Sequence, residues 1–392
     1  MALLDKFAAV AAIRAGLNTS SHDPTQVVIG TIISATEGIV EGRHTILAGT
    51  NNYLGLTFDP ACIAAGQNAL ATQGSGTTGS RMANGSYATH AALEQELADF
   101  YEMPYGMVFS TGYAANLGTL AALLTPGDAV LLDADAHASL YDGCRMSGAE
   151  IFRFKHNDVV SLEKRLQRLG ERAENCLIVT EGLYSVLGDC APLRQIVEVA
   201  ERFGAKLLVD EAHSLGAYGD HGRGVAEAEG VLDRVDFVVG TFSKSLGAMG
   251  GFCVSPHAEL KLFRYVSRPF IFTASSSPSI IATTREALRQ LVARPELRQT
   301  LWRNARQLYQ GVQSIGFTTG PEVSPVVAVR IGEKEAALQC WNRLLELGIY
   351  VNLMIPPASP DSSSYLRCSV SAAHTTAQME TILEAFRQLR QN

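Results

Sequence analysis

The chain has 392 residues, 47% hydrophobic and 18% charged, which is enough for two or three globular domains with a large apolar core. A net charge of -7 at pH 7 excludes the basic surface that nucleic-acid-binding domains carry. The seven cysteines are scattered without a CxxC pair, which favours buried reduced thiols over disulfides or zinc and a cytoplasmic location.

The N-terminal segment, MALLDKFAAVAAIRAG, has an apolar helical pattern that Asp5, Lys6 and Arg14 interrupt. It is too short and too charged to cross a membrane, and it lacks the features of a signal peptide. The alternatives for it are contact with membrane lipid and packing on a partner subunit. The expected parts of the chain are an N-terminal helix and extension, a large domain and a small C-terminal domain, over 1–45, 46–280 and 281–392.

Short apolar runs alternate with amphipathic stretches in the middle of the chain. The runs expected to be buried strands are 129–133, 176–180, 206–210, 235–240 and 251–254. Between them, 159–170 and 192–204 have helical patterns, and the second begins with Pro and ends at Gly, as helices often do. This alternation predicts an α/β fold with a mostly parallel sheet covered on both faces.

After about residue 280 the pattern changes to that of a smaller α+β unit. A long helical stretch is followed by alternating strands and helices and by one loop rich in Pro and Ser. The expected elements are helices over 278–315, 333–347 and 375–390, strands over 325–331, 349–353 and 365–370, and a loop over 355–364.

The segment FVVGTFSKSLGAMGG, residues 237–251, places one lysine among small and hydroxylic residues after a predicted strand. Lys244 lies between Ser243 and Ser245, which is a poor setting for a solvated charge. A Schiff base needs a lysine held in a cleft, beside hydroxyls and amides that bind a phosphate. Lys244 is therefore a candidate to carry pyridoxal 5′-phosphate (PLP). The alternative is a surface lysine in a Ser/Gly loop.

The segment KLLVDEAHSL, residues 206–215, ends a predicted strand with two polar side chains. An acid at Asp210 can pair with the protonated pyridine nitrogen of PLP and keep the ring an electron sink. His213 is placed to bond the phenolic oxygen of the same ring. The alternatives are a pair of metal ligands and an aspartate that caps a helix. Because Lys244 follows one βα unit later, both segments are expected at neighbouring strand ends.

Two further segments end predicted strands in the same way. In VFSTGYAANLGT, residues 108–119, a strand leads into a helix whose free N–H groups near Gly112 form either an anion site or a plain helix cap. His137 follows the run 129–133, and an imidazole there either stacks on a cofactor ring or is structural. Ligands of open α/β sheets bind at such strand ends.

The run GSGTTG, residues 74–79, matches GxGxxG but is not a dinucleotide-binding motif. Residues 60–73 before it read as a helix, whereas that motif needs a strand before its glycines. No Lys-Ser/Thr pair follows Gly79, which excludes a Walker A loop as well. A tight loop near the site is expected here.

Together these segments resemble the α-oxoamine synthases, a family of fold-type I PLP enzymes that join an amino acid to an acyl-CoA with loss of CO₂. The resemblance runs from about Asn51 to the C-terminus. The motifs that carry it are NNYLGL, GSGTTGSRMANG, FSTGYAANLG, DADAHASLYDG, EGLYSVLGD, VDEAHSLGAYGDHGRG, GTFSKSLG, RPFIFTAS and LRCSVSAAHT. It implies a fold-type I PLP transferase, with a mostly parallel central sheet in the large domain and a smaller C-terminal α+β domain. It also implies a homodimer with the active site at the subunit interface.

The resemblance also implies roles for individual residues, and no metal is among them. Lys244 is expected to carry PLP and then to act as the base at Cα, with His137 stacked on the ring. Asp210 and His213 are expected to bond the ring nitrogen and the phenolic oxygen. The expected phosphate contacts are Gly112, Tyr113, Thr241 and Ser243, with Thr273, Ala274 and Ser275 reaching in from the partner subunit. The expected supporting and substrate-binding residues are Glu181, Ser185, Asn52, Tyr53, Ser80, Arg81 and, for the substrate carboxylate, Arg367.

The sequence is most similar to soluble bacterial members that condense L-serine with palmitoyl-CoA to 3-oxosphinganine, CoA and CO₂, the first step of sphingolipid synthesis. Ser80 stands where glycine-specific members carry Thr, which leaves room for a substrate Cβ. Ile355 stands where some serine-using members have an Arg that reaches the carboxylate, so either Arg367 suffices or the substrate differs. One alternative is a synthase that uses alanine or glycine with another acyl-CoA. The other is a non-catalytic PLP-fold regulatory subunit, which the presence of Lys244 and Asp210 disfavours.

Overall fold

A computed structural model of the chain describes residues 3–17 and 22–391. Their contacts divide into two compact units. Unit 1 takes the described residues of Met1–Thr50, Val186–Gly188 and Trp302–Asn392, and unit 2 consists of Asn51–Ser185 and Asp189–Leu301. In the part of the chain described, no helix is both long and apolar enough to span a membrane.

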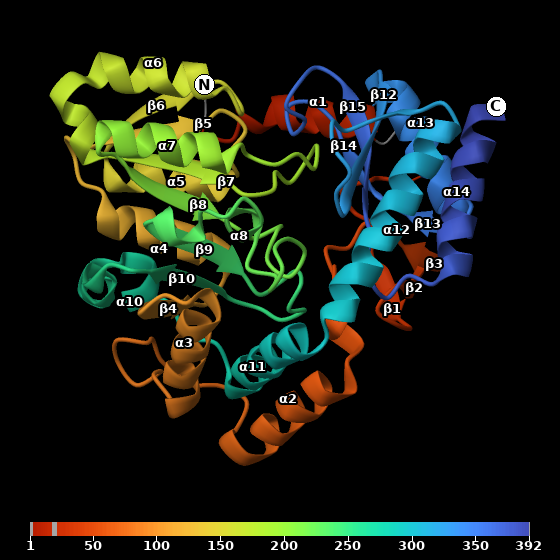
Figure 1. The fold of residues 1–392 in the computed structure, drawn as a ribbon. Helices are drawn as coiled ribbons and strands as arrows, with labels where there is room; N and C mark the ends of the chain where they lie inside the picture. The colour runs from red at the N-terminus through yellow and green to blue at the C-terminus, as the bar shows by residue number, and fades with distance from the viewer. Residues whose placement is uncertain (1–2, 18–21, 392) are drawn as a thin grey trace. The chain divides into compact units, whose positions relative to one another are not determined.

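Unit 2 is built on a seven-stranded sheet in the order β4-β10-β9-β8-β7-β5-β6 (Figure 1). All strands run parallel except β10, which pairs antiparallel with both of its neighbours. The predicted α/β fold with a mostly parallel sheet is therefore confirmed. The strands are β4 (Tyr105–Phe109), β5 (Ala129–Asp133), β6 (Glu150–Phe154), β7 (Cys176–Glu181), β8 (Lys206–Asp210), β9 (Phe237–Thr241) and β10 (Gly251–Ser255).

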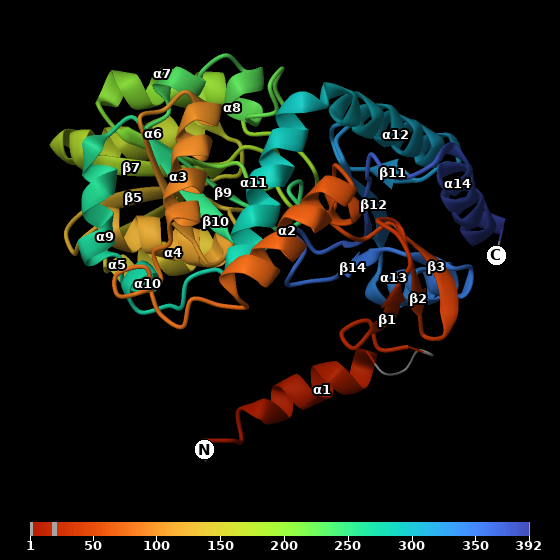
Figure 2. The same cartoon turned by 90° about the horizontal axis from the view of Figure 1, so that it is seen from below.

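Helices cover both faces of this sheet, because the central strands are apolar on both sides. Alternate residues such as Val130 and Leu132 pack beneath α4 (Gly112–Leu123), α5 (Ala138–Ser147), α9 (Phe263–Val266) and α10 (Arg268–Ile271). Helices α6 (Val159–Leu169) and α7 (Leu193–Phe203) lie on the opposite face (Figure 2). There Tyr101, at the end of α3 (Ala88–Tyr101), packs on Phe252 of β10.

The remaining elements of unit 2 include the helix pair α2 (Pro60–Gln73) and α11 (Pro278–Ala293), which pack side by side (Figure 1). The single helix predicted over 278–315 is in fact two, because Pro295 starts a new helix, α12 (Pro295–Ser314). The residue before a proline is driven out of the helical region, and Arg294 has φ -126° and ψ 65°. The short elements are α8 (Val225–Ala228), η1 (Leu56–Phe58), η2 (Gly170–Asn175), η3 (Leu232–Arg234) and η4 (Ala258–Leu262).

Unit 1 contains two four-stranded sheets, in the orders β1-β2-β3-β13 and β11-β12-β15-β14. The strand predicted over 349–353 is split, because β13 pairs with β3 in one sheet and β14 pairs with β15 in the other. The strands are β1 (Ile29–Ile32), β2 (Glu37–Val40), β3 (Arg43–Leu47), β11 (Thr318–Thr319), β12 (Val326–Gly332), β13 (Ile349–Tyr350), β14 (Asn352–Met354) and β15 (Ser364–Ser369). The helices besides α12 are α1 (Phe7–Leu17), α13 (Lys334–Glu346) and α14 (Thr376–Gln391).

The limits between the units differ from those expected at 45/46 and 280/281. The N-terminal strands join unit 1 because β3 pairs with β13, and α11 joins unit 2 because it packs on α2 and α3. The division consequently falls after Thr50 and again inside α12, after Leu301.

Candidate active site

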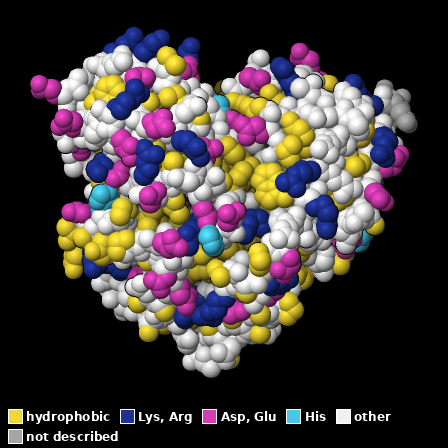
Figure 3. Space-filling model, in the orientation of Figure 1, with side chains coloured by type: hydrophobic (Ala, Val, Ile, Leu, Met, Phe, Trp, Pro, Cys, Tyr) yellow, Lys and Arg dark blue, Asp and Glu magenta, His cyan; other side chains and the backbone are white. Residues whose placement is uncertain are grey.

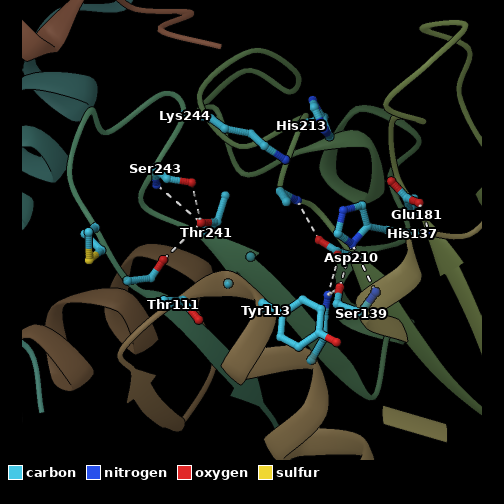
Figure 4. Close-up of a pocket in the computed structure, with 16 residues that line it drawn as sticks. Thr111, Tyr113, His137, Ser139, Glu181, Asp210, His213, Thr241, Ser243 and Lys244 are labelled. Carbon is cyan, nitrogen blue, oxygen red and sulfur yellow. Dashed lines mark hydrogen bonds between the residues drawn. The ribbon is translucent and has the colours of Figure 1, made fainter. Parts of the chain in front are cut away.

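A cavity of about 390 Å³ opens at the carboxyl ends of the central strands of unit 2 (Figure 4). The ends of β7, β8 and β9 contribute side chains to it, and so do the N-terminal turns of α4 and α5. The side chain of Lys244 is directed toward the side of the cavity where His137 and Asp210 lie. The lining residues are Thr111, Gly112, Tyr113, Asn116, His137, Ser139, Glu181, Asp210, Ala212, His213, Gly240, Thr241, Ser243, Lys244, Met249 and Gly250.

Asp210 is the buried acid of this cavity, at the last position of β8. Its Oδ1 accepts a hydrogen bond from the backbone N–H of Ala212 at 2.9 Å. Its Oδ2 accepts one from the Nδ2 of Asn116 at 2.7 Å. The two donors fix the carboxylate plane, and a carboxylate oxygen has a second lone pair for a further donor. Asp210 can therefore bind a protonated ring nitrogen without giving up either contact.

His137 caps the N-terminus of α5 beside Asp210. Its Nδ1 accepts the backbone N–H of Ser139 at 3.2 Å and lies 2.7 Å from the Ser139 hydroxyl. Burial lowers the pKa of His137, which favours the neutral ring with its proton on Nε2. The backbone N–H of His137 donates to Oε1 of Glu181 at 2.6 Å. Burial, and then the charge of Asp210, raise the pKa of Glu181 well above its usual value.

His213 is held from behind by Tyr53, which the sequence predicted as a substrate residue. The Tyr53 hydroxyl lies 2.7 Å from Nδ1 of His213, and both side chains are buried. Nδ1 of His213 therefore faces Tyr53, and the His213 side chain is part of the cavity lining.

The opposite wall of the cavity brings an N-terminal helix turn against two hydroxyls. Thr111 caps α4 by accepting the N–H of Ala114, so the first N–H groups of the helix point outward beside Gly112. The hydroxyls of Thr241 and Ser243 are hydrogen-bonded to each other at 2.9 Å. A Cβ on Gly112 would lie 2.7 Å from Cβ of Thr241, so only glycine lets the helix approach this closely. Donors arranged like this suit a phosphate.

Most of the residues predicted for the cofactor line this one cavity. They are Gly112, Tyr113, His137, Glu181, Asp210, His213, Thr241, Ser243 and Lys244. The hydroxyl of Tyr113 donates to Asp142 at 2.6 Å, so its phenol is already engaged there. Ser185 lies outside the lining, on the hairpin that follows β7. Asn52 is buried outside the lining, where its Nδ2 donates to Thr57 at 2.7 Å.

The other predicted residues lie elsewhere. Arg367 is buried on β15 in unit 1, where it donates to the Ser369 hydroxyl at 2.6 Å. A second cluster in unit 2, which we call the 80/274 cluster, joins two loops through a bridge between Ser80 and Ala274. It holds the remaining predicted residues Arg81, Thr273 and Ser275, and none of its members lines the cavity.

Arg81 is the centre of charge in the 80/274 cluster. Its guanidinium donates to Oε1 of Glu94 at 3.0 Å, and both side chains are more than 90% buried. It also lies over the ring of Phe270 at 5.3 Å. The predicted substrate-binding arginine therefore serves an internal ion pair within its own chain.

Asn116, Ser139 and Met249 line the cavity but were not among the predicted site residues. Asn116 follows Gly112 by four positions on α4, so helical spacing places the two residues on the same face of the helix. That spacing was the available signal. Ser139 and Met249 carry no comparable signal, since their place depends on how loops fold back over the strand ends.

Comparison with known proteins places the chain in a family. Residues 43–386 match the family model described as aminotransferase class I and II. The serine palmitoyltransferase of Caulobacter vibrioides is 52% identical over 99% of this chain and 96% of its own. That of Sphingomonas paucimobilis is 50% identical over 98% of this chain and 92% of its own.

Solved structures are similar over the same extent. The Sphingomonas wittichii serine palmitoyltransferase has a TM-score of 0.96 and 49% identity over 99% of this chain and 98% of its own. Another solved structure, described as a high-resolution structure of SPT with the PLP internal aldimine, has a TM-score of 0.97 and 50% identity, with the same coverage. The chain thus belongs to the aminotransferase class I and II family, in the group of the bacterial serine palmitoyltransferases, and the resemblance to α-oxoamine synthases is confirmed.

Proposed function

We propose that this chain is a PLP-dependent acyltransferase that condenses L-serine with palmitoyl-CoA to 3-oxosphinganine, releasing CoA and CO₂. The observation that carries the proposal is the single cavity that combines Lys244, the buried Asp210 and the phosphate-type turn at Gly112. The names of the relatives that are at least 50% identical over nearly the whole chain support the choice of serine and a long acyl chain.

The residues of the cavity fit PLP part by part. Lys244 would hold the aldehyde carbon covalently, and Asp210 would accept the ring N–H. His213 would face the phenolic oxygen, and the turn at Gly112 with Thr241 would take the phosphate. The bound cofactor supplies an electron sink for the pair left at Cα, first on loss of the proton and again on loss of CO₂.

The chain's own residues would then handle protons and orientation. Lys244 would hold the cofactor before serine arrives, and once serine is bound the Lys244 amine would take the Cα proton. His137, neutral and protonated on Nε2, can donate to a substrate oxygen and keep the carboxylate in place. Arg367 would bind the carboxylate electrostatically and position the substrate for the acyl transfer.

We further propose a homodimer in which the 80/274 cluster completes the partner's site. No residue of the 80/274 cluster lines the cavity of its own chain. The loop of the cluster that begins at Thr273 follows a run of exposed hydrophobic side chains in the sequence. These are Leu262, Tyr265, Val266 and Phe272, between 55% and 73% exposed. Figure 3 shows hydrophobic side chains gathered over α10, in the lower left of that view.

A cytoplasmic location and peripheral contact of α1 with lipid stay predictions.

The test is spectroscopic and chemical. Purified protein should absorb as a lysine-bound PLP, and L-serine should shift that absorbance whereas alanine and glycine should not. With palmitoyl-CoA and serine the ketone product, identified by mass, should be 3-oxosphinganine. A shift with alanine or glycine, and a ketone of another mass, would instead favour another α-oxoamine synthase, in which Ile355 marks the difference. Protein without any PLP absorbance would contradict the enzyme assignment.

A further inference from the structure

Beside the cavity, but not lining it, lies a histidine clamped between two aspartates. His156 follows β6, and its Nδ1 is 2.9 Å from Oδ1 of Asp133. Its Nε2 is 2.7 Å from Oδ2 of Asp189. Ionised carboxylates can only accept hydrogen bonds, whereas a neutral imidazole has one donor. Two carboxylate partners therefore require the doubly protonated imidazolium.

The surroundings of His156 favour its cationic form at neutral pH. Burial alone would lower the pKa of His156, but the hydrogen bonds and charges of Asp133 and Asp189 outweigh it and raise the pKa to about 10. Asp135 adds a third carboxylate at 3.9 Å, and the ring of Tyr184 packs edge-on with centroids 4.4 Å apart. The Asp133 side chain is wholly buried and that of Asp189 is 9% exposed, so neither can rely on water for its charge.

One end of this clamp holds the loop that presents His137. Asp133 is the last residue of β5, and its Oδ1 also accepts the N–H of Asp135 at 2.8 Å. Its carbonyl accepts the N–H of Ala136 at 3.2 Å, which closes the turn. The next residue is His137, whose ring lines the cavity. A shift of Asp133 would therefore move the turn that sets the position of this ring.

The other end holds the base of the hairpin that leaves the cavity after Glu181. Leu183 and Cys190 bridge its two arms, and the carbonyl of Asp189 accepts the N–H of Tyr184 at 2.9 Å. Asn157, next to His156, donates to Oδ2 of Asp189 at 2.8 Å. The His156 ring thus links the hairpin to the His137 loop. Asn157 reinforces this link, since its backbone N–H also donates to Asp133 at 3.0 Å, and His137 bonds Glu181 directly at 2.6 Å.

We propose that His156 is a positioning residue of this active site, a cationic clamp that fixes His137 through Asp133 and the Glu181 hairpin through Asp189. The inference rests on the proposed function, since it assigns His156 a part in orienting the cofactor ring. His156 does not line the cavity, so it acts only through the residues that it holds.

Two amide variants separate the ends of the clamp. The amide nitrogen of Asn in His156→Asn replaces Nδ1 and keeps the bond to Asp133. That of Gln in His156→Gln replaces Nε2 and keeps the bond to Asp189. A matched control is His257→Gln, because His257 also pairs with an aspartate, at 2.7 Å from Asp236, and does not line the cavity.

The main readout is the circular dichroism of the bound PLP band, which reports how the ring is held and does not require turnover. We expect His156→Gln to lose most of this signal and to lower kcat by roughly 10- to 100-fold, as small misplacements do. The KM for acyl-CoA should change less than kcat. His156→Asn should lose less than His156→Gln, and His257→Gln should match the wild type.

If both His156 variants keep the wild-type dichroism and kcat and lose only thermal stability, the clamp is merely structural and the proposal is wrong. Equal losses in the two variants would contradict the route through Asp133 to His137. A wild-type protein with no PLP band would instead contradict the proposed function, so the two failures are distinguishable.

A second variant covers the case in which His156 variants do not fold. Asp189→Asn keeps the shape of the side chain and removes one of the carboxylates that face His156, leaving Asp133 and Asp135. The pH at which the dichroism declines should then be lower than in the wild type. An unchanged pH profile in folded Asp189→Asn protein would overturn the cationic clamp.

Discussion

At the scale of single residues, Lys244 makes the simplest prediction. Lys244→Ala should abolish the absorbance of lysine-bound PLP and lower turnover on the order of a thousandfold or more, because anchor and base are lost together. Absorbance spectra and product mass spectrometry measure the two effects. Lys206→Ala is the control, since Lys206 is an exposed residue at the start of β8 that pairs with Asp236 and lies outside the cavity. Turnover near the wild-type level in Lys244→Ala would rule out the assigned role.

Asn116 gives a second residue-scale prediction through its 2.7 Å bond to Asp210. A hydrogen bond to a charged group contributes about 1.5–3 kcal/mol. Asn116→Ala should therefore weaken PLP binding by roughly 10- to 100-fold. Asn116→Asp should weaken it further, because it places a like charge beside Asp210. Fluorescence titration of the cofactor-free protein with PLP gives both affinities, and wild-type affinity in Asn116→Asp would contradict this role.

Site residues could be predicted from the sequence where they stand at the end of a strand. They could not be predicted where their position depends on how a loop or helix packs against the rest of the chain. Lys244, Asp210 and His137 each follow an apolar run, so the sequence alone placed them at one sheet edge. An arginine such as Arg81 is a residue type that often binds substrate carboxylates. Its actual partner, Glu94, is on α3, and the sequence does not show that this helix packs against the loop of Arg81. A buried ion pair of this kind leaves no periodic signal.

At the scale of elements, the approach of α4 to β9 depends on Gly112. In Gly112→Ala the new Cβ would lie 2.7 Å from Thr241, so the helix turn must withdraw from the phosphate position. Overpacking of this kind costs about 1–3 kcal/mol. We expect a lower melting temperature and weaker PLP binding, both measured on the same preparation. Gly76→Ala is the matched control because nothing lies within 4 Å of its Cβ.

Elements were predicted best in the core of unit 2. The runs at 129–133 and 206–210 coincide with β5 and β8, because strands buried on both faces have a continuous apolar centre. By contrast, β1 was missed, since its four residues are mostly exposed and carry no apolar pattern. The stretch 349–353 has one apolar pattern, yet pairing with different partners divides it between two sheets.

At the scale of the whole molecule, the proposed dimer makes the exposed side chains after η4 testable. Phe272, 73% exposed, immediately precedes Thr273 of the 80/274 cluster. Phe272→Asp should shift the protein toward monomer in sedimentation experiments and weaken PLP binding, because the partner's contribution is lost. Val160→Asp, on α6 and 60% exposed, should do neither. A stable dimer in Phe272→Asp would place the interface elsewhere. From the sequence, the homodimer was predicted only by the family resemblance.

The clamp at His156 also predicts how stability depends on pH. The pKa of His156 is raised from 6.5 to about 10 in the folded chain, so its stabilisation is complete below pH 6.5 and is lost as pH rises to about 10. The hydrogen bonds and charges of Asp133 and Asp189 set this range, and Asp135 and Tyr184 also face the ring. His156→Gln has no such charge to lose. The difference in free energy of unfolding between wild type and His156→Gln, measured with urea, should therefore shrink steadily from pH 6.5 to 10. A difference that stays constant across that range would mean that His156 is not held as a cation.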